Sequence, residues 1–326
     1  PFPWLPSADK WRETGLKILS RELERQIYPD GVPAEQAIHY LAFILDFNIL
    51  AWRLAELNGI SPPSIWYERL GAACDFISCV MDEQGNVPAI GDSDDAWVVR
   101  LDESPDANNF RSILATAAVL LRRPDLKSVA KEWDEKSHWL LGESGRATFD
   151  SLPARSHAIP SRAFERGGYC VMRSSKRVTV FDCGPLGYLS IAAHGHTDAL
   201  SLTVSVDGLP LLIDPGTYAY HEGGEYRDYF RSTRAHNTIV LDGRDQSEML
   251  GLFLWGRKAV AELLHWETTD EYDLAIAEHD GYANLGVIHR RGVLFYKPDW
   301  IIVWDFFVGH GEHSFEQLWH LPPGCR

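Results

Sequence analysis

The sequence predicts a multi-domain α + β protein, with a helical N-terminal half followed by a large antiparallel β-sandwich. Apolar residues recur at helical spacing up to about residue 145, and they alternate with polar residues at a period of two after residue 165. Helical segments do not interrupt the strand-like half, which favours antiparallel sheets. We therefore predict a helical domain at residues 1–145, a linker at 146–165 and a β domain at 166–326.

The helical half contains five predicted helices. They are residues 11–27, 34–58, 62–81, 110–122 and 126–141. Asn58-Gly59 is a usual C-terminal stop signal, and Pro62-Pro63 is tolerated in the first turn of the next helix. Successive helix–turn–helix hairpins suggest an α/α array of the toroid type. Five helices make an incomplete toroid, so we expect this domain to be incomplete at its start.

The second half reads as short strands joined by tight turns. The predicted strands are residues 168–173, 178–182, 189–192, 200–206, 211–214, 238–241, 259–262, 272–278, 287–295 and 300–307. Asp207-Gly208 and Asp242-Gly243 are typical hairpin turns. A further strand-like segment at 316–321 is followed directly by Pro322-Pro323-Gly324, so we expect the β domain to be truncated at its end.

Composition restricts the possible partners. The fractions of hydrophobic (45%) and charged (24%) residues are those of a soluble globular protein, and apolar runs are too short to predict membrane insertion. The net charge of −15 argues against nucleic acid as a partner. The five cysteines are odd in number and lack metal-type spacing, which favours buried free thiols over a disulfide framework.

The most informative residues are His194, His196, Asp214 and His236, each at the end of a predicted strand. Side chains two apart on a strand project to the same face, so the first two histidines are expected to lie together, and pairing of neighbouring strands would add the others. Imidazole nitrogens and a carboxylate suit zinc. Asn237 follows His236 and could orient it or contact a ligand. The alternative is a set of hydrogen-bonded histidines at strand ends.

A second group lies near the start of the most apolar helix. Glu35 and His39 are four residues apart, as are Gln36 and Tyr40, so each pair should share a helix face. Polar side chains on such a helix need partners or a cavity. The alternative is a solvated first turn.

A third group, residues 225–234, collects three arginines and two tyrosines just before His236. Arginine lowers the pKa of a nearby tyrosine, and it binds carboxylate or sulfate in bidentate fashion. Tyr226 and Tyr229 are therefore candidates for proton transfer, and Arg231 and Arg234 for substrate binding. The alternative is an exposed loop with ordinary ion pairs.

The segment from Ile90 to Asp95 resembles the opening of a calcium loop. It lacks the later glycine and the terminal glutamate of an EF-hand. We therefore expect a loop that caps a helix or frames a cleft.

Six segments together resemble the heparinase II/III-like family of polysaccharide lyases. They are residues 31–40, 88–95, 166–169, 194–198, 212–217 and 231–238, which follow the family order across both halves. The resemblance implies an α/α toroid joined to an antiparallel β-sandwich. It also implies β-elimination at a uronic acid, in which a base removes the C5 proton and an acid protonates the bridging oxygen.

The resemblance assigns roles residue by residue. His196, Asp214 and His236 resemble the family's zinc ligands, a site that shapes the cleft more than it performs chemistry. His194 resembles the catalytic histidine. The carboxylate-neutralising residues correspond to Gln36 and His39, where several relatives have Asn at the position of Gln36. The family's helical-half tyrosine has no counterpart at residues 90–95.

The expected function is therefore cleavage of an acidic, uronate-containing polysaccharide, either an exopolysaccharide or a glycosaminoglycan. The catalytic candidates are His194, Tyr226, Tyr229, Gln36 and His39, and the substrate-binding candidates are Arg231, Arg234, Asn237, Tyr40 and Glu35. Tyr40 is a further candidate for the missing tyrosine, and the activity is altered or lost if none replaces it.

The sequence is also compatible with two other functions. A cupin-like enzyme would use the His-x-His pair to bind iron or manganese, but the long helical half and a missing glutamate count against it. A non-catalytic glycan-binding protein would keep the fold without the activity. We expect a periplasmic or secreted bacterial protein, with the cytoplasm as the alternative, and the sequence predicts no oligomeric state.

Overall fold

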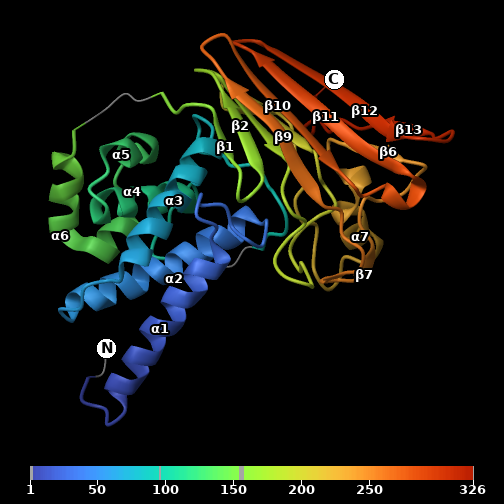
Figure 1. Cartoon of the computed structure of the whole chain (residues 1–326). Coiled ribbons are helices and arrows are strands. Elements are labelled where there is room, and N and C mark those ends of the chain that lie inside the picture. The colour runs from blue at the N-terminus through green and yellow to red at the C-terminus, as the bar shows by residue number, and fades with distance from the viewer. Residues whose placement is uncertain (1–2, 95–96, 154–157, 326) are drawn as a thin grey trace. The chain divides into compact units, whose positions relative to one another are not determined.

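Helices occupy the first half of the chain and antiparallel sheets the second half (Figure 1) in the computed structural model, which describes residues 3–94, 97–153 and 158–325. This confirms the predicted order of helical and strand-rich parts. Internal contacts divide the chain into two units. The first comprises Pro1–Pro33, Leu41–Ser78 and Asp95–His157, and the second comprises Ala34–Tyr40, Cys79–Asp94 and Ala158–Arg326. Two short segments of the helical half thus belong to the same unit as the sheets.

The helices begin and end close to the predicted positions, with two exceptions: the second helix starts at Ile38 and not at residue 34, and the last predicted helix is divided. The helices are α1 (Ala8–Gln26), α2 (Ile38–Leu57), α3 (Ser64–Val80), α4 (Asn109–Leu120), α5 (Pro124–Ala130) and α6 (Glu135–Ser151). The predicted helix at 126–141 is two helices, because Lys131 has a φ of 69° and Asp134 caps a new helix by accepting from the Ser137 amide at 2.7 Å. Residues 154–157 of the predicted linker lie outside the described residues.

Helix α2 is strongly apolar. Among the described residues it is the one helix whose length and composition would allow it to cross a membrane, with a mean hydropathy of 1.3, and half of its most apolar window is buried. It also carries Asp46, whose carboxylate forms a fully buried ion pair with Lys136 at 2.6 Å. The core helix of a soluble protein passes the same test, so this helix does not overturn the prediction from composition.

The strand-rich unit contains two larger antiparallel sheets. The first has the order β1 (Arg162–Phe164), β2 (Tyr169–Arg173), β3 (Arg177–Asp182), β4 (Leu202–Val206) and β5 (Leu209–Leu212). The second has the order β12 (Trp300–Gly309), β11 (Val287–Tyr296), β10 (Tyr272–His279) and β9 (Ala261–Thr268). Two short ribbons pair β13 (Phe315–Gln317) with β6 (Ile239–Leu241), and β7 (Met249–Gly251) with β8 (Leu254–Trp255).

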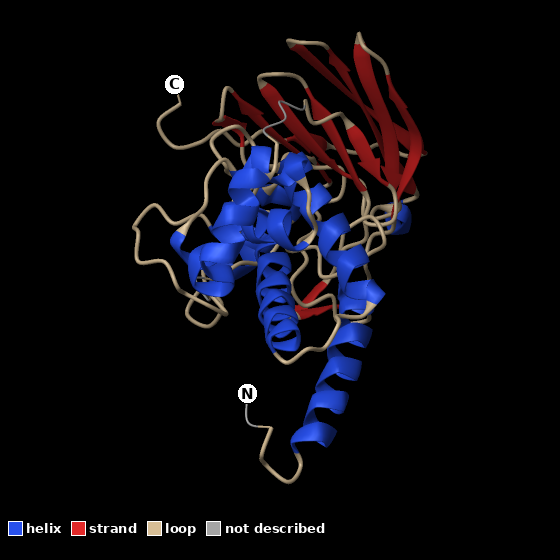
Figure 2. Cartoon of the chain, turned by 90° about the vertical axis from the view of Figure 1, so that its left-hand side faces the viewer, coloured by secondary structure: helices blue, strands red, loops and turns tan. Residues whose placement is uncertain are grey.

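The two larger sheets share one hydrophobic core. Burial alternates along β10, as the period of two predicts, and its buried Ala275 packs with Val293 of β11. Phe181 of β3 and Leu202 of β4 join the same cluster from the other sheet. Figure 2 shows the strands of this unit gathered as adjacent layers. Connections at the ends of these layers carry the polar residues of the candidate site.

Four of the cysteines, including Cys170 and Cys183, are buried free thiols, which confirms the prediction of no disulfide framework. The predicted strand at 189–192 is wrong. Leu189 and Ala192 have φ values of 55° and 48°, which are incompatible with an extended strand, and the segment forms turns.

Candidate active site and metal centre

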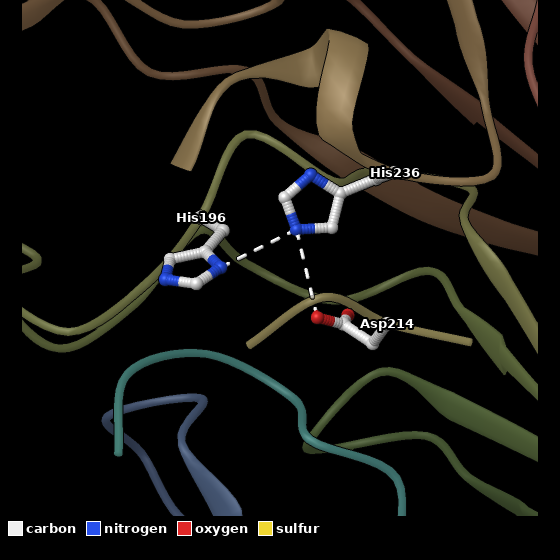
Figure 3. A group of neighbouring side chains, drawn as sticks. All are labelled: His196, Asp214 and His236. Atoms are coloured by element: carbon white, nitrogen blue, oxygen red, sulfur yellow. Dashed lines mark hydrogen bonds and ion pairs between the residues drawn. The ribbon is translucent and has the colours of Figure 1, made fainter. Parts of the chain in front are cut away.

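Three side chains from separate segments converge on one point in the strand-rich unit (Figure 3). His196 lies in the connection between β3 and β4, Asp214 lies two residues after β5, and His236 follows a short 3-10 turn at Thr233–Ala235. The Nδ1 atom of His196 is 3.3 Å from Nε2 of His236, which is 3.8 Å from Oδ1 of Asp214. Both imidazoles are fully buried and the carboxylate is 3% exposed. We call these three residues the triad.

His194 and His196 do not lie on one strand face, contrary to the prediction, since residues 189–200 form turns and not a strand. Both rings nevertheless reach the same partner, the Asp92 carboxylate. Tertiary packing of the loop, not strand geometry, brings them together.

Hydrogen bonds to the outer nitrogens fix the orientation of both triad histidines. Nδ1 of His236 is 2.8 Å from the Ser232 carbonyl oxygen, and Nε2 of His196 is 3.0 Å from Oδ1 of Asp92. Carbonyl and carboxylate oxygens only accept, so these outer nitrogens carry the hydrogens, and in neutral rings the inner nitrogens present lone pairs. Outer hydrogen bonds of this kind accompany most metal-binding histidines.

In neutral rings the two inner lone pairs would repel each other, and a cation between them would remove this repulsion. Their 3.3 Å separation fits a metal, because two nitrogens bound tetrahedrally to zinc are about 3.3 Å apart. The third donor, Asp214, supplies an oxygen, and the candidate ligand atoms of the triad all lie within 4.8 Å of one another. The triad therefore has the donors and the spacing of a metal site.

Electrostatics at the triad also favour a cation. Burial raises the pKa of Asp214 to about 6, opposed by His196, and burial lowers the pKa of His236 well below its ordinary value. Asp198 is buried nearby, and its pKa is raised by burial and then by Asp182 and Asp214. Burial thus disfavours the charged form of both carboxyl groups, and a bound cation would offset that penalty.

Asp92 is the most connected side chain of the site, and sequence reasoning did not identify it. Its Oδ1 accepts from His196 and from Thr217 Oγ1 at 3.1 Å, while its Oδ2 lies 3.3 Å from His194 Nδ1. Arg227 forms a bidentate ion pair with both oxygens, and neither side chain is exposed. Burial alone would raise the pKa of Asp92, but hydrogen bonds from His194, His196 and Arg227 hold that pKa well below its usual range.

Gly91 allows Asp92 to take this position. Its φ is +66°, and a Cβ there would lie 2.2 Å from the Gln36 carbonyl oxygen and 2.9 Å from that of His194. The Asp92 amide also donates to the His194 carbonyl at 2.9 Å. The loop that sequence reasoning expected to frame a cleft thus lies against the site and supplies its central acid. Asp95, at the end of that loop, lies outside the described residues.

Aromatic side chains surround His194. Its ring stacks on Tyr40 at 4.1 Å between centroids with an interplanar angle of 22°, and Phe253 meets it edge-on at 5.9 Å. The Tyr40 hydroxyl is 2.9 Å from the hydroxyl of Tyr220. Burial raises the pKa of both tyrosines, and the shared hydrogen bond raises that of Tyr220 further, so both phenols hold their protons. Tyr220 was not a candidate from sequence.

The segment before α2 differs from the helical prediction. Gln36 has a φ of +56° and the helix begins at Ile38, so Glu35 and His39 do not share a helix face. The buried Gln36 amide donates to the Gly167 carbonyl at 3.2 Å, and its Oε1 has no partner among the described residues. Burial raises the pKa of Glu35, and the charge of His194 opposes this. His39 is half-buried in the first turn of α2.

The arginines of residues 225–234 are already engaged. Arg231, expected to contact substrate, is fully buried, donates to Asp228 at 3.0 Å and to the Gly251 carbonyl, and stacks on Trp255. Arg234 forms an exposed ion pair with Glu316. Helix α7 (Glu225–Arg231) explains the difference from an open loop, since its spacing turns Arg227 and Arg231 inward together.

The remaining predicted site residues make other contacts. Tyr226 and Tyr229 are 54% and 44% exposed on α7, where their rings contact Tyr218 and Phe230. Asn237 is fully buried, and its amide donates to the Leu202 and Ile213 carbonyls at 2.7 and 2.8 Å. Its oxygen accepts from the His320 amide, so the Asn237 side chain joins three backbone segments.

Weak signals in the sequence pointed to the missed residues. Asp92 follows a glycine in a loop that is rich in acids, and Tyr220 lies six residues after Asp214, beyond a Pro-Gly turn. Neither signal specifies a contact with His194.

Comparisons with known proteins agree with the earlier resemblance. Residues 157–326 match the family model described as "Heparinase II/III-like, C-terminal", and residues 1–114 match "Heparinase II/III N-terminus". Among characterised proteins, the heparin-sulfate lyase of Pedobacter heparinus is 24% identical over 332 residues, which are 98% of this chain and 44% of that protein. The heparin-sulfate lyase of Bacteroides thetaiotaomicron is 24% identical over 344 residues, covering 99% of this chain and 44% of that protein.

Solved structures show the same fold. A heparan sulfate lyase from Pedobacter heparinus matches with a TM-score of 0.74 at 21% identity, over 98% of this chain and 45% of that one. A heparinase III matches with a TM-score of 0.75 at 22% identity, over 99% and 47% of the two chains. This chain thus spans less than half the length of the relatives that it matches.

Proposed function

This chain belongs to the heparinase II/III-like family, and on that basis we propose that it acts as a polysaccharide lyase. The proposed substrate is an acidic, uronate-containing polysaccharide, and the names of the relatives favour a glycosaminoglycan of the heparan sulfate type. One observation carries the proposal. The imidazole of His194, 21% exposed, stacks on Tyr40 beside a metal-type triad.

The proposed reaction is β-elimination. A base takes the C5 proton of the uronate, the bond from C4 to the bridging oxygen breaks, a C4–C5 double bond forms, and an acid returns a proton to the leaving oxygen. His194 is the proposed base, and its Nδ1 faces the Asp92 carboxylate, leaving Nε2 for the substrate. The hydrogen-bonded pair of Tyr40 and Tyr220 is proposed to supply the acid, because the raised pKa values of both residues keep their phenols protonated.

The C5 proton is weakly acidic, so the substrate carboxylate must be neutralised while charge develops on it. Gln36 and His39 are proposed for this role, and Glu35, whose pKa is raised by burial, is proposed to line the same region. Arg227, Arg231 and Arg234 already have acidic partners. We therefore expect recognition of the uronate carboxylate to dominate over recognition of sulfate.

The proposed metal is zinc, held by His196, Asp214 and His236. Bound there, zinc would supply positive charge and fix the loops that carry these ligands. His194 then stands beside the metal centre and faces the substrate. Tyr226 and Tyr229, the candidates from sequence, become alternatives to the Tyr40–Tyr220 pair on the exposed face of α7.

The remaining sequence expectations are also proposals. The helices would form part of an α/α toroid, and the two larger sheets a β-sandwich, with domains at 1–145 and 166–326 joined by a linker at 146–165. We propose that the protein acts in the periplasm or outside a bacterial cell.

The test is a screen of acidic polysaccharides with the full chain, followed by ultraviolet absorbance of the unsaturated uronate and by product mass. The panel should include exopolysaccharides and heparan sulfates of low and high sulfation, and we expect faster cleavage at low sulfation. His194→Ala should abolish the activity, and His265→Ala, on the exposed face of β9, should not.

Three other results would contradict the proposal. Full activity in His194→Ala would exclude the proposed base. Glycan binding without product would favour the non-catalytic alternative. Bound iron or manganese in place of zinc would favour the cupin-like alternative.

A further inference from the structure

We propose that Asp92 is a positioning residue that couples the triad to His194, so that one carboxylate sets both the metal affinity and the orientation of the proposed base. The inference rests on the zinc site proposed above. Asp92 is not one of the three proposed metal ligands. It acts through the two histidines.

The two oxygens of Asp92 divide between the two histidines. Oδ1 lies 3.0 Å from Nε2 of His196, whose opposite nitrogen faces the triad, and Oδ2 lies 3.3 Å from Nδ1 of His194, whose opposite nitrogen faces away from the carboxylate. A rotation of the carboxylate would change both contacts at once. The same carboxylate therefore orients the ring of His196, a proposed metal ligand, and the ring of His194, the proposed base.

The carboxylate is held from further directions. Arg227 binds both oxygens, and Thr217 donates to Oδ1 at 3.1 Å. Arg227 is anchored in turn by the Leu252 carbonyl at 3.1 Å, and its guanidinium lies 5.1 Å from the ring centre of Tyr220 and 5.5 Å from that of Phe253. The ion pair thus connects the triad, the base and the aromatic residues around it.

The backbone adds a link of its own. The Asp92 amide donates to the His194 carbonyl at 2.9 Å, and Gly91 allows the close approach that this bond requires. Because the side chain and the main chain of Asp92 both contact the loop at His194, a shift of one segment must move the other. Coupling between metal and base follows from this shared contact.

The experiment measures zinc affinity by competition with a chelator and thermal stability of the zinc-free protein. Asp92→Asn keeps the size of the side chain but removes its charge, and we expect zinc binding to weaken by about 10- to 100-fold, as for other outer hydrogen-bond partners of metal ligands. This change leaves Arg227 buried without a counter-charge, so Asp92→Asn/Arg227→Met is made in parallel. Once a substrate is known, both variants should lower kcat more than they change KM.

Asp305→Asn is the matched control. Asp305 is also buried, accepts from His289 at 2.6 Å and binds Arg291 through both oxygens, but it contacts no triad residue. Asp305→Asn should lower the melting temperature of the protein and leave its zinc affinity unchanged. If neither Asp92 variant folds, Thr217→Val removes only one hydroxyl from Oδ1 and should weaken zinc a few-fold.

The outcomes separate the inference from the proposed function. If a folded Asp92 variant binds zinc as tightly as the wild type, the coupling through Asp92 is contradicted and the proposed function is not. The same result in Thr217→Val has this meaning if neither Asp92 variant folds. Equal weakening in Asp305→Asn would also contradict the coupling, because the effect would then be one of general stability. A wild-type chain that binds no zinc overturns both the proposed metal site and this inference.

Discussion

The Nδ1 atom of His196 and the Nε2 atom of His236 face each other at 3.3 Å, and the outer nitrogen of each ring is hydrogen bonded to an acceptor. This relationship leads to the first prediction. Zinc at 100 times its dissociation constant should stabilise the chain by about 2.7 kcal/mol, and a chelator should reverse this. The shift should disappear in His236→Ala and persist in His265→Ala, as measured by thermal unfolding with and without zinc. An equal shift in His236→Ala would place the metal elsewhere.

The second prediction concerns the tyrosine that transfers the proton. Tyr220→Phe and Tyr40→Phe should each lower kcat by about 100- to 10,000-fold, because a phenol that acts as general acid is lost. Tyr272→Phe, on the surface of β10, is the control and should behave as wild type. Initial rates on the best polysaccharide measure the effect. A comparable loss in Tyr226→Phe, with activity kept in Tyr220→Phe, would return the role to α7.

The third prediction concerns Gly91. Gly91→Ala places a methyl group against the Gln36 and His194 carbonyls, so it should both destabilise the fold and weaken zinc binding through Asp92. Gly243→Ala is the matched control, because its φ of +68° is similar and nothing lies within 4 Å. Gly243→Ala should lower the free energy of unfolding by only about 1 kcal/mol, through backbone strain. Urea unfolding and zinc titration of both variants measure the difference, and equal behaviour would contradict the role of close packing at Gly91.

The fourth prediction concerns a buried histidine chain outside the site. His279 Nδ1 accepts from the Gly281 amide, so its Nε2 donates to His289 Nδ1 at 3.0 Å, and His289 donates to Asp305 at 2.6 Å. Burial is the main cause that lowers the pKa of both histidines, and the neighbouring Arg291 adds to it. The folded state therefore binds these protons less readily than the unfolded state does.

It follows that their contribution to stability is present above an ordinary pKa of about 6.5 and is lost as pH falls toward the folded pKa values. His289→Gln removes one titrating group and a hydrogen bond to a charged partner, and should cost about 2 kcal/mol at pH 7.5. The difference from wild type should shrink at pH 5.5, as measured by urea unfolding at both pH values. A difference independent of pH would contradict this account, and His265→Gln serves as the exposed control.

Periodicity was sufficient to predict the order of helices and strands, because it reports local burial. The alternation along β10 and the apolar face of α2 are examples. The same reasoning failed at Leu189–Ala192 and at Gln36, where left-handed backbone interrupts an apolar run. Such conformations are stabilised by contacts with distant segments, as at Gly91 and Gln36, and they leave little trace in local composition.

The sequence alone was enough to recognise the family and to single out His194, His196, Asp214 and His236, because a His-x-His pair, an Asp-Pro-Gly turn and a later histidine follow one another in order. The family resemblance then selected the last three of these residues, whose candidate ligand atoms lie within 4.8 Å of one another in the structure. The folded structure was needed to find the contacts of Asp92, the pairing of Tyr40 with Tyr220, and the inward orientation of Arg227 and Arg231. Those relationships join residues more than 100 positions apart in the case of Asp92 and His196. Their physical cause is the need of buried charges and polar groups for partners, which chain folding supplies and no local pattern records.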